Sequence, residues 1–404
     1  MSKIKKLKRG NVTSPKGFLA AGLYCGIKKS GKKDLAVVYS EKDAVCAALF
    51  TTNRVQAWPV IYSRKVINRP THRAILATSG NANCVNGING KRALLEGVRL
   101  LSRELGVGAN KILVVQTGVI GRPFPLKALR YGIPQVACKL SPAGGKDAAQ
   151  AILTTDTRTK EVAYKTKIGS SAVQVGAIAK GSGMIHPQMA TLLCFITTDV
   201  AISKPLLKKA LREIVGPVFN SLAIDNDMST NDTVFVLANG AAGNKKIVSS
   251  DQHFEQFKAV LKVVAVDIAR KLIADAEGGT RVAEIVVSCA RSDDEALCVA
   301  RHIGTSMLFK TMLAGADPNM GRVVACIGSS GANFSLKRLT VSFDGVCVFR
   351  SGRHIVSNLK QARQILRKKS YQVKINLGVG KGQSVFLTSD LTKAYVQINS
   401  AYST

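Results

Sequence analysis

The chain has few aromatic residues, no long apolar run and no apolar leader. Aromatic residues make up 5% of its 404 residues, and there is one tryptophan, which is too few for an evident base-stacking platform. No apolar run approaches the ~18–20 residues that cross a bilayer, so we expect no membrane span. The opening MSKIKKLKRG is basic but contains no hydrophobic segment, and we expect neither a secretory signal nor a transit peptide.

Patterns of metal-binding and disulfide-forming residues are also missing. The nine cysteines are odd in number and include no CxxC pair, which favours free thiols in a reducing compartment over a disulfide framework or a zinc site. The five histidines are dispersed, and no HExxH motif occurs. We therefore expect a cytoplasmic protein that needs neither a metal nor a cofactor.

Acidic residues are scarce relative to basic ones. Lysine and arginine total 58 against 25 acidic residues, which gives a net charge of +33. Such an excess attracts polyanions through phosphate neutralisation, yet the basic residues are scattered, apart from runs at 3–9 and 28–33. No helix-turn-helix, zinc-finger or RNA-binding motif occurs. We interpret the charge as a solvated surface and expect no specific nucleic-acid partner, with a non-catalytic polyanion-binding protein as one alternative.

The length and the apolar content predict a large core shared between two domains. Hydrophobic residues make up 46% of the chain. Helical spacing predicts one helix capped by Ser203, with Pro205 in its first turn, and another over about 254–272. Short apolar runs predict strands, so the chain reads as α/β; the strands are expected at 111–115, 192–196, 282–287, 341–343, 346–349 and 385–388.

The segment KGSGMIHPQMATLLCFITTD, from Lys180 to Asp199, is the most informative. A glycine-broken loop ends in Met-Ala-Thr and meets the apolar run that follows. Cleavage between Ala190 and Thr191 would place a hydroxyl and a free amine on one residue, and that amine can act as the base for the hydroxyl. The local pattern alone favours a threonine that simply begins a strand.

The wider sequence resembles the ornithine acetyltransferase family, also called the glutamate N-acetyltransferase family. The matching motifs occur in order over nearly the whole chain: NVTSPKGFLAAGLYCG near the start, FTTNRVQAWPV from Phe50, SGNANC from Ser79, QTGVIG from Gln116, AILTTDT from Ala151, IDNDMSTNDT from Ile224, ADAEGGTR from Ala274, GADPNMGR from Gly315 and SDLTKAYVQINSAYST to Thr404. The resemblance implies an αββα sandwich like that of N-terminal-nucleophile hydrolases, with a smaller C-terminal α/β domain.

The resemblance also implies self-cleavage. An alpha chain of residues 1–190 would separate from a beta chain of residues 191–404. The beta chain would complete the large domain to about 280 and form the smaller domain over about 281–404. Two alpha and two beta chains would make a heterotetramer.

Residue roles carry over where the motifs match. Thr191 would be the nucleophile, and Thr117 and Gly118 would form the oxyanion hole. Lys180 would pair with the α-carboxylate of the acetylated amino acid, and Glu277 would contact ornithine. Further substrate-binding positions of the family correspond to Thr154, Asn399 and Thr404. Taken alone, each of these residues is also typical of an ordinary loop or of a solvent-exposed surface.

The implied reaction is ping-pong transfer of an acetyl group from N²-acetylornithine to glutamate, which yields ornithine and N-acetylglutamate. Some members also accept acetyl-CoA, which leaves amino-acid N-acetyltransferase activity open for this chain. Gln116, Asn226 and Met320 depart from the family pattern, and Asn tolerates the positive φ of the glycine it replaces. A related N-terminal-nucleophile aminopeptidase is the other alternative, although that class usually employs serine.

Overall fold

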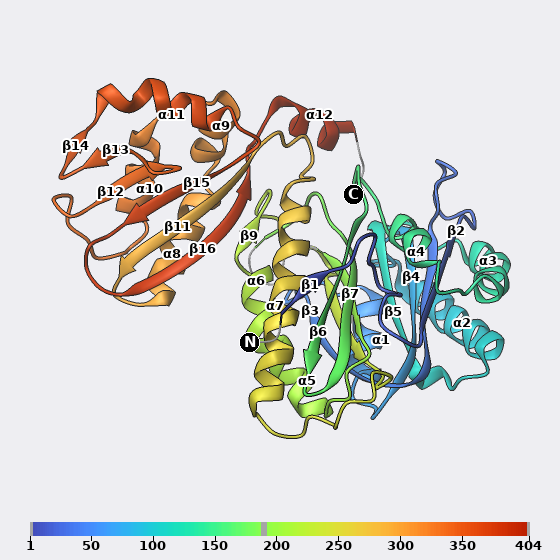
Figure 1. Cartoon of the computed structure of the whole chain (residues 1–404). Helices are drawn as coiled ribbons and strands as arrows, with labels where there is room; N and C mark the ends of the chain where they lie inside the picture. The colour runs from blue at the N-terminus through green and yellow to red at the C-terminus, as the bar shows by residue number, and fades with distance from the viewer. Residues whose placement is uncertain (1–2, 187–191, 402–404) are drawn as a thin grey trace.

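The computed structural model describes residues 3–186 and 192–401, which form two parts, each built on one β-sheet (Figure 1). The larger part holds the N-terminal two thirds of the chain, and the C-terminal part holds most of the rest. Among the described helices, none combines the length and the apolar character needed to cross a membrane.

In the described chain the larger sheet has nine strands, in the order β1-β6-β7-β8-β10-β3-β4-β5, with β2 paired to β3. The long strand β3 (Leu35–Phe50) pairs with β2 and β4 through its first half and with β10 through its second. The other strands are β1 (Lys5–Lys6), β2 (Phe18–Leu23), β4 (His72–Asn81), β5 (Ile112–Val119), β6 (Lys160–Ile168), β7 (Ser171–Lys180), β8 (Leu193–Thr198) and β10 (Thr233–Ala238).

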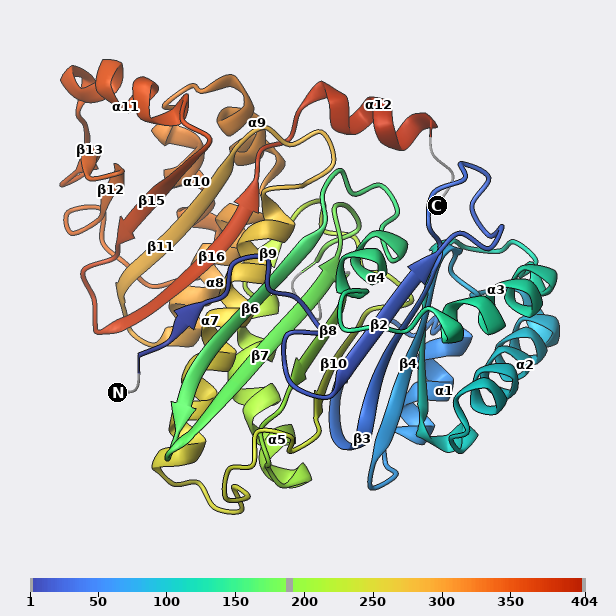
Figure 2. The same cartoon turned by 45° about the vertical axis from the view of Figure 1, so that its right-hand side comes forward.

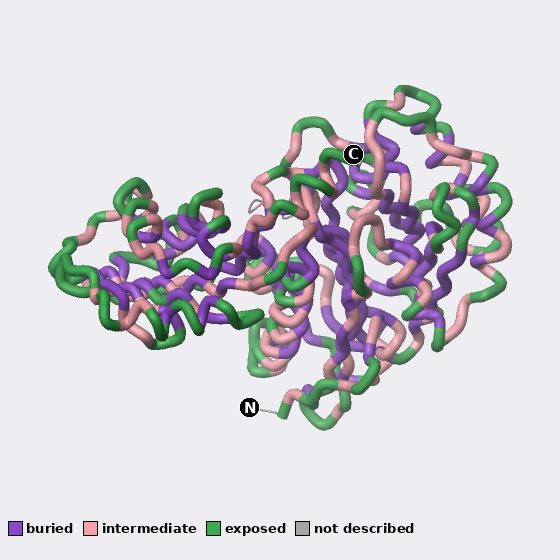
Figure 3. The backbone as a smooth tube through the Cα atoms, turned by 90° about the horizontal axis from the view of Figure 1, so that it is seen from above, coloured by how far each residue is buried: buried purple, intermediate pink, exposed green. Residues whose placement is uncertain are grey.

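The two halves of this sheet pack face to face. In β8, Leu193 and Phe195 belong to a core shared with β2, β4 and β5 from the other half. Cys194 and Ile196 point the opposite way, into a second core against α7 (Gln252–Ile273). Because both faces are covered, the strand is a continuous apolar run, as expected for a strand buried on both sides. Figure 3 shows that buried backbone, in purple, fills the interior of the larger part.

Helices cover the outer face of each half (Figure 2). One outer layer holds α7, and the other holds α2 (Gly87–Leu105) and α3 (Leu126–Cys138). The layer order is therefore helix, sheet, sheet, helix, and the predicted αββα sandwich is confirmed. Other elements of this part are α1 (Trp58–Val66), the 3-10 turn Ala109–Lys111, α4 (Gly145–Ala151), α5 (Lys204–Ala210), the π turn Leu211–Val215 and α6 (Gly216–Phe219).

Both predicted helices are confirmed: α7 begins and ends within two residues of the expected bounds, and α5 begins where expected. In α7 the side chain of Asp251 caps the first turn by accepting from the backbone N–H groups of His253 and Phe254. Ser203 occupies the N-cap position of α5 and Pro205 its first turn, but the Ser203 side chain makes no capping hydrogen bond. The position was predicted correctly and the hydrogen bond was not.

The C-terminal part has a seven-stranded sheet within the described residues, in the order β14-β13-β12-β15-β11-β16-β9. The last strand in this order, β9 (Leu222–Ala223), comes from the larger part of the chain and pairs with β16. The remaining strands are β11 (Val282–Ala290), β12 (Thr340–Phe343), β13 (Val346–Arg350), β14 (Arg353–His354), β15 (Ser370–Asn376) and β16 (Gly382–Ser389), so the strands predicted here are confirmed.

Helices of the C-terminal part pack on this sheet around a core of their own. They are α8 (Asp293–Gly304), α9 (Met307–Gly315), α10 (Met320–Ser329), the 3-10 turn Val356–Asn358 and α11 (Leu359–Leu366). The last helix, α12 (Lys393–Ala401), leaves this part and returns over the larger one (Figures 1 and 2). Residues distant in sequence thereby meet at one end of the sandwich.

Candidate active site

A cavity of about 280 Å³ lies where β5 and β7 end and where α12 reaches the larger part. Six of the predicted site residues line it: Thr117, Gly118, Thr154, Lys180, Glu277 and Asn399. The predicted cleavage residues Ala190 and Thr191, and the predicted substrate-binding Thr404, lie outside the described residues. The fold thus brings together residues from five separate segments.

Gly118 occupies a position that no other residue fits. Its φ is +128°, and a Cβ atom there would lie 2.4 Å from the carbonyl carbon of Gly80. The close approach arises because β4 and β5 run parallel and pair Gly80 with Gly118. A glycine both adopts this φ and lets the two backbones meet. Thr117 and Gly118 therefore reach the cavity on a rigid strand end.

Gln116, a departure from the family pattern, is buried and held by polar contacts. Its side chain donates to the hydroxyl of Thr78 at 3.2 Å and accepts from the amide of Asn83 at 2.7 Å. Its backbone carbonyl accepts from the side chain of Asn231 at 2.8 Å. These contacts tie the end of β5 to its neighbours directly before Thr117.

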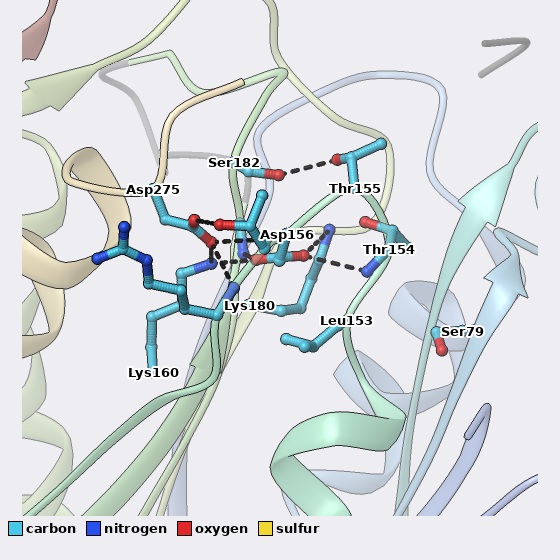
Figure 4. Close-up of polar contacts among 12 residues, drawn as sticks. Ser79, Leu153, Thr154, Thr155, Asp156, Lys160, Lys180, Ser182 and Asp275 are labelled. Carbon is cyan, nitrogen blue, oxygen red and sulfur yellow. Dashed lines mark hydrogen bonds and ion pairs between the residues drawn. The ribbon is translucent and has the colours of Figure 1, made fainter. Parts of the chain in front are cut away.

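Lys180 is the last residue of β7, and its side chain is almost wholly buried beside the cavity. Its Nζ lies 3.9 Å from Oδ2 of Asp156 (Figure 4). Burial lowers the pKa of Lys180, because a desolvated ammonium is disfavoured, and the charge of Asp156 opposes that effect. The site thus contains a cation that has few water contacts and a fixed carboxylate partner.

Asp156 and Lys160 were not singled out from the sequence, yet they lie at the centre of the polar network. Asp156 accepts from the backbone N–H of Gly181 at 2.7 Å and from that of Thr154 at 3.0 Å. Lys160 donates to Asp156 and also to Asp275. Burial works against the ionised form of Asp156, but the charges of Lys180 and Lys160 outweigh it and lower the pKa to about 2.

Glu277 lies in a turn after α7 and faces the cavity together with α12. Its backbone N–H donates to the carbonyl of Ser182 at 2.7 Å. Its carboxylate accepts from the side chain of Asn399 at 2.9 Å. A Cβ on Gly183 would lie 2.4 Å from the same carboxylate, so the loop packs directly on Glu277.

Asp225 is a second carboxylate that the sequence reasoning missed. It accepts from the backbone N–H groups of Met184 at 2.6 Å and Ile185 at 2.8 Å, and from the hydroxyl of Tyr395 at 3.2 Å. Burial raises its pKa, and the backbone hydrogen bonds oppose that rise. Met184 has a φ of +55°, which is unfavourable for a non-glycine residue. Asp225 therefore holds a strained turn shortly before the predicted cleavage point.

The cavity is divided electrostatically. Lys180 lines it as a cation, whereas Asp225, Asp227 and Glu277 line it as carboxylates. This division suits a small ligand that carries both a carboxylate and an ammonium group. Within residues 3–186 and 192–401, no cluster of histidine, cysteine and acidic side chains could hold a metal ion.

Comparison with known proteins identifies relatives over the full length of the chain. A sequence profile described as the ArgJ family matches residues 19–404. An arginine biosynthesis bifunctional protein ArgJ of Synechococcus sp. is 40% identical over 405 residues, which cover 98% of each chain. A glutamate N-acetyltransferase of Methanocaldococcus jannaschii is 40% identical over 407 residues, which cover 98% of this chain and 99% of the relative.

Solved structures of similar proteins match part of the chain. The arginine biosynthesis bifunctional protein argJ of Bacillus halodurans is 36% identical, with a TM-score of 0.44, and covers 47% of this chain and 100% of its own. The ornithine acetyltransferase of Mycobacterium tuberculosis, complexed with ornithine, is 34% identical, with the same TM-score and the same coverages.

The full-length matches carry the conclusion. They confirm the family predicted from the sequence motifs and, with it, the predicted class of enzyme, an acetyltransferase of arginine biosynthesis. The αββα layers observed here are those that this family implied. On this evidence the chain belongs to the ArgJ family.

Proposed function

We propose that the chain cleaves itself between Ala190 and Thr191 and then transfers an acetyl group from N²-acetylornithine to glutamate. The pairing of Lys180 with Leu193 across β7 and β8 supports this most directly. Thr191 precedes Leu193 by two residues along the chain. Thr117, Gly118 and Glu277 line the cavity that Lys180 also lines.

In the first half-reaction the hydroxyl oxygen of Thr191 attacks the acetyl carbonyl of N²-acetylornithine. The α-amine of Thr191 takes the hydroxyl proton and passes it to the departing nitrogen, so the C–N bond breaks and ornithine leaves. Thr117 and the backbone N–H of Gly118 stabilise the negative oxygen of the tetrahedral intermediate, a type of contact worth about 10²–10³ in rate.

In the second half-reaction the α-amine of glutamate attacks the acetyl-threonine ester. The ester C–O bond breaks, Thr191 regains its proton, and N-acetylglutamate leaves. Both substrates carry an α-carboxylate, and Lys180 binds it in each half-reaction. Glu277 binds the extra ammonium group of ornithine, with Thr154, Asn399 and Thr404 as further substrate contacts.

The assembly we propose is a heterotetramer of two alpha chains, residues 1–190, and two beta chains, residues 191–404. The location we propose is the cytoplasm, with no metal required. Acetyl-CoA as an alternative donor would make the enzyme an N-acetylglutamate synthase as well. Omitting acetylornithine and supplying acetyl-CoA with glutamate tests that second activity directly.

Intact-mass analysis of purified protein tests the proposal. Wild type should give two fragments that meet at Ala190–Thr191, and Thr191→Ala should stay whole and transfer no acetyl group. Thr191→Ser keeps a hydroxyl and should be cut more slowly, which separates loss of the nucleophile from damage to the loop. A wild type that stays whole, or acetyl transfer by Thr191→Ala, would overturn the proposal.

A further inference from the structure

Four charged side chains form a connected row (Figure 4), and the last of them, Lys180, lines the candidate cavity. Lys160 forms ion pairs with both Asp275 and Asp156, and Asp156 also forms an ion pair with Lys180. The side chains of Asp156, Lys160, Lys180 and Asp275 are each less than one tenth exposed. The charges alternate and balance, as buried ion pairs require.

The row joins three segments that line the cavity. Asp156 holds its own loop through Thr154 and holds the start of the loop after β7 through Gly181. Asp275 accepts from the backbone N–H and the hydroxyl of Thr157 and lies two residues before Glu277. A carboxylate at position 156 therefore touches both the backbone and the cation of the site.

We propose that Asp156 is a positioning residue that keeps Lys180 charged and directed at the α-carboxylate of the substrate. This inference rests on the substrate-binding role proposed for Lys180. Asp156 itself touches no substrate, because its side chain is fully buried. Its effect passes through the ammonium group of Lys180.

The charged groups that face Lys180 come from every element packed against it. They are Asp156 and Lys160 on one side, with Glu277 after α7, Asp232 before β10, and Lys28 after β2. Asp156 makes the largest favourable contribution among them. An opposite charge within about 4–6 Å moves a pKa by roughly 1–3 units, so its loss should be measurable.

The direction of the pH effect follows from the sign of the charge. Asp156 raises the pKa of Lys180 against the lowering caused by burial. Asp156→Asn should therefore lower that pKa further, and Lys180 should lose its proton at a lower pH. Substrate binding should weaken at alkaline pH first, and acidification should restore part of it.

The experiment compares Asp156→Asn with Asp275→Asn in the full-length enzyme. Both variants remove a carboxylate from Lys160, but Asp156 alone of the two forms an ion pair with Lys180. The KM for N²-acetylornithine and the affinity for ornithine, by calorimetry, are measured from pH 6 to pH 10. For Asp156→Asn we expect the loss of binding at alkaline pH to begin about one pH unit lower than in wild type, and the KM at pH 9 to rise about tenfold. For Asp275→Asn we expect the loss of binding at alkaline pH to begin where it does in wild type.

If binding weakened at the same alkaline pH in both variants, the inference would be overturned, since a purely structural role predicts equal effects. Should Asp156→Asn fail to fold, the double variant Asp156→Asn with Lys160→Met keeps the charges balanced. It should show a smaller shift in the same direction, because it also removes the repulsion of Lys160; no shift would again overturn the inference. Wild type that binds ornithine but transfers no acetyl group would refute the proposed function and leave the binding comparison valid.

Discussion

Two buried lysines, one in each part of the molecule, are satisfied in different ways. Lys160 in β6 is 1% exposed and donates to the carboxylates of Asp156 and Asp275. Lys310 in α9 is 2% exposed and donates to the hydroxyl of Thr388 at 2.9 Å and to Ser389. The first is paired with charge, and the second is bonded to neutral oxygens.

The difference follows from what each lysine joins. Lys160 shares the carboxylate of Asp156 with Lys180, which lines the cavity. Lys310 ties α9 to the end of β16, where backbone and hydroxyl oxygens suffice. Burial lowers the pKa of Lys310 to about 8, although Asp390 and Asp225 oppose that shift. Lys160 therefore has two carboxylate partners beside the candidate cavity, whereas Lys310 has neutral partners and a pKa shifted toward physiological pH.

Replacing each lysine should have the largest effect on stability, and the two losses should differ. Lys160→Met leaves two buried carboxylates without their cation and should lower the free energy of unfolding by about 3–5 kcal/mol. Lys310→Met leaves hydroxyl and carbonyl oxygens without a donor and should cost about 1–3 kcal/mol. Urea unfolding at pH 7 measures both, and an equal loss would show that the carboxylates do not distinguish the two sites.

A pair of glycines sharpens the comparison for function. Gly118→Ala would force a Cβ into the backbone of β4 and should reduce acetyl transfer by about 10²-fold or more. Gly345, in the turn between β12 and β13, has a φ of +89° with no atom near its missing Cβ. Gly345→Ala should cost about 1 kcal/mol of stability and leave acetyl transfer intact. Steady-state kinetics with thermal unfolding of both variants separates these effects.

The pH dependence of stability tests the lowered pKa of Lys310. Between pH 8 and 10.5 the unfolded chain holds a proton on this lysine that the folded chain has lost, so stability rises with pH. The gain in wild type relative to Lys310→Met should be on the order of 3 kcal/mol at most. Thermal midpoints of both proteins from pH 7 to pH 10 provide the measurement; parallel curves would contradict it.

Asn226 connects the two parts, and its replacement should have a small effect on stability. Its φ is +71°, and its side-chain amide donates to the carbonyl of Thr305 at 2.9 Å. Asn226→Ala should lose about 1–2 kcal/mol through backbone strain and the lost hydrogen bond. Asn226→Gly also loses the hydrogen bond but relieves the backbone strain. A smaller loss in the free energy of unfolding for Asn226→Gly than for Asn226→Ala, measured by chemical denaturation, would separate the two contributions.

The elements of the fold were largely predictable because their apolar spacing is local information. The helix over 254–272 and the strands near 282, 341 and 385 occur as expected. The positive φ of Asn226 was anticipated from its residue type and is confirmed. The capping bond of Ser203 was not realised, since a side chain at the right position still has a choice of partners.

The polar network of the site was not predictable in the same way. Asp156 and Asp275 lie in motifs that were recognised, and Lys160 lies three residues after one of them. A sequence, however, does not tell a solvated charge from a buried one. Asp225 looked like one of several acidic residues in IDNDMSTNDT, and its contacts with Met184 and Ile185 cross about forty residues. The roles of Thr191 and Thr404 stay predictions, since both lie outside the described residues.

By itself the sequence determined the family, the place of several strands and helices, and the residue types available for acyl transfer. Those properties depend on motifs and on spacing along the chain. The tertiary structure alone decided that Lys180 shares a cavity with Glu277 and Asn399, and that Asp156 is buried beside it. The physical reason is that burial and charge pairing arise from contacts between distant segments, which local pattern does not encode.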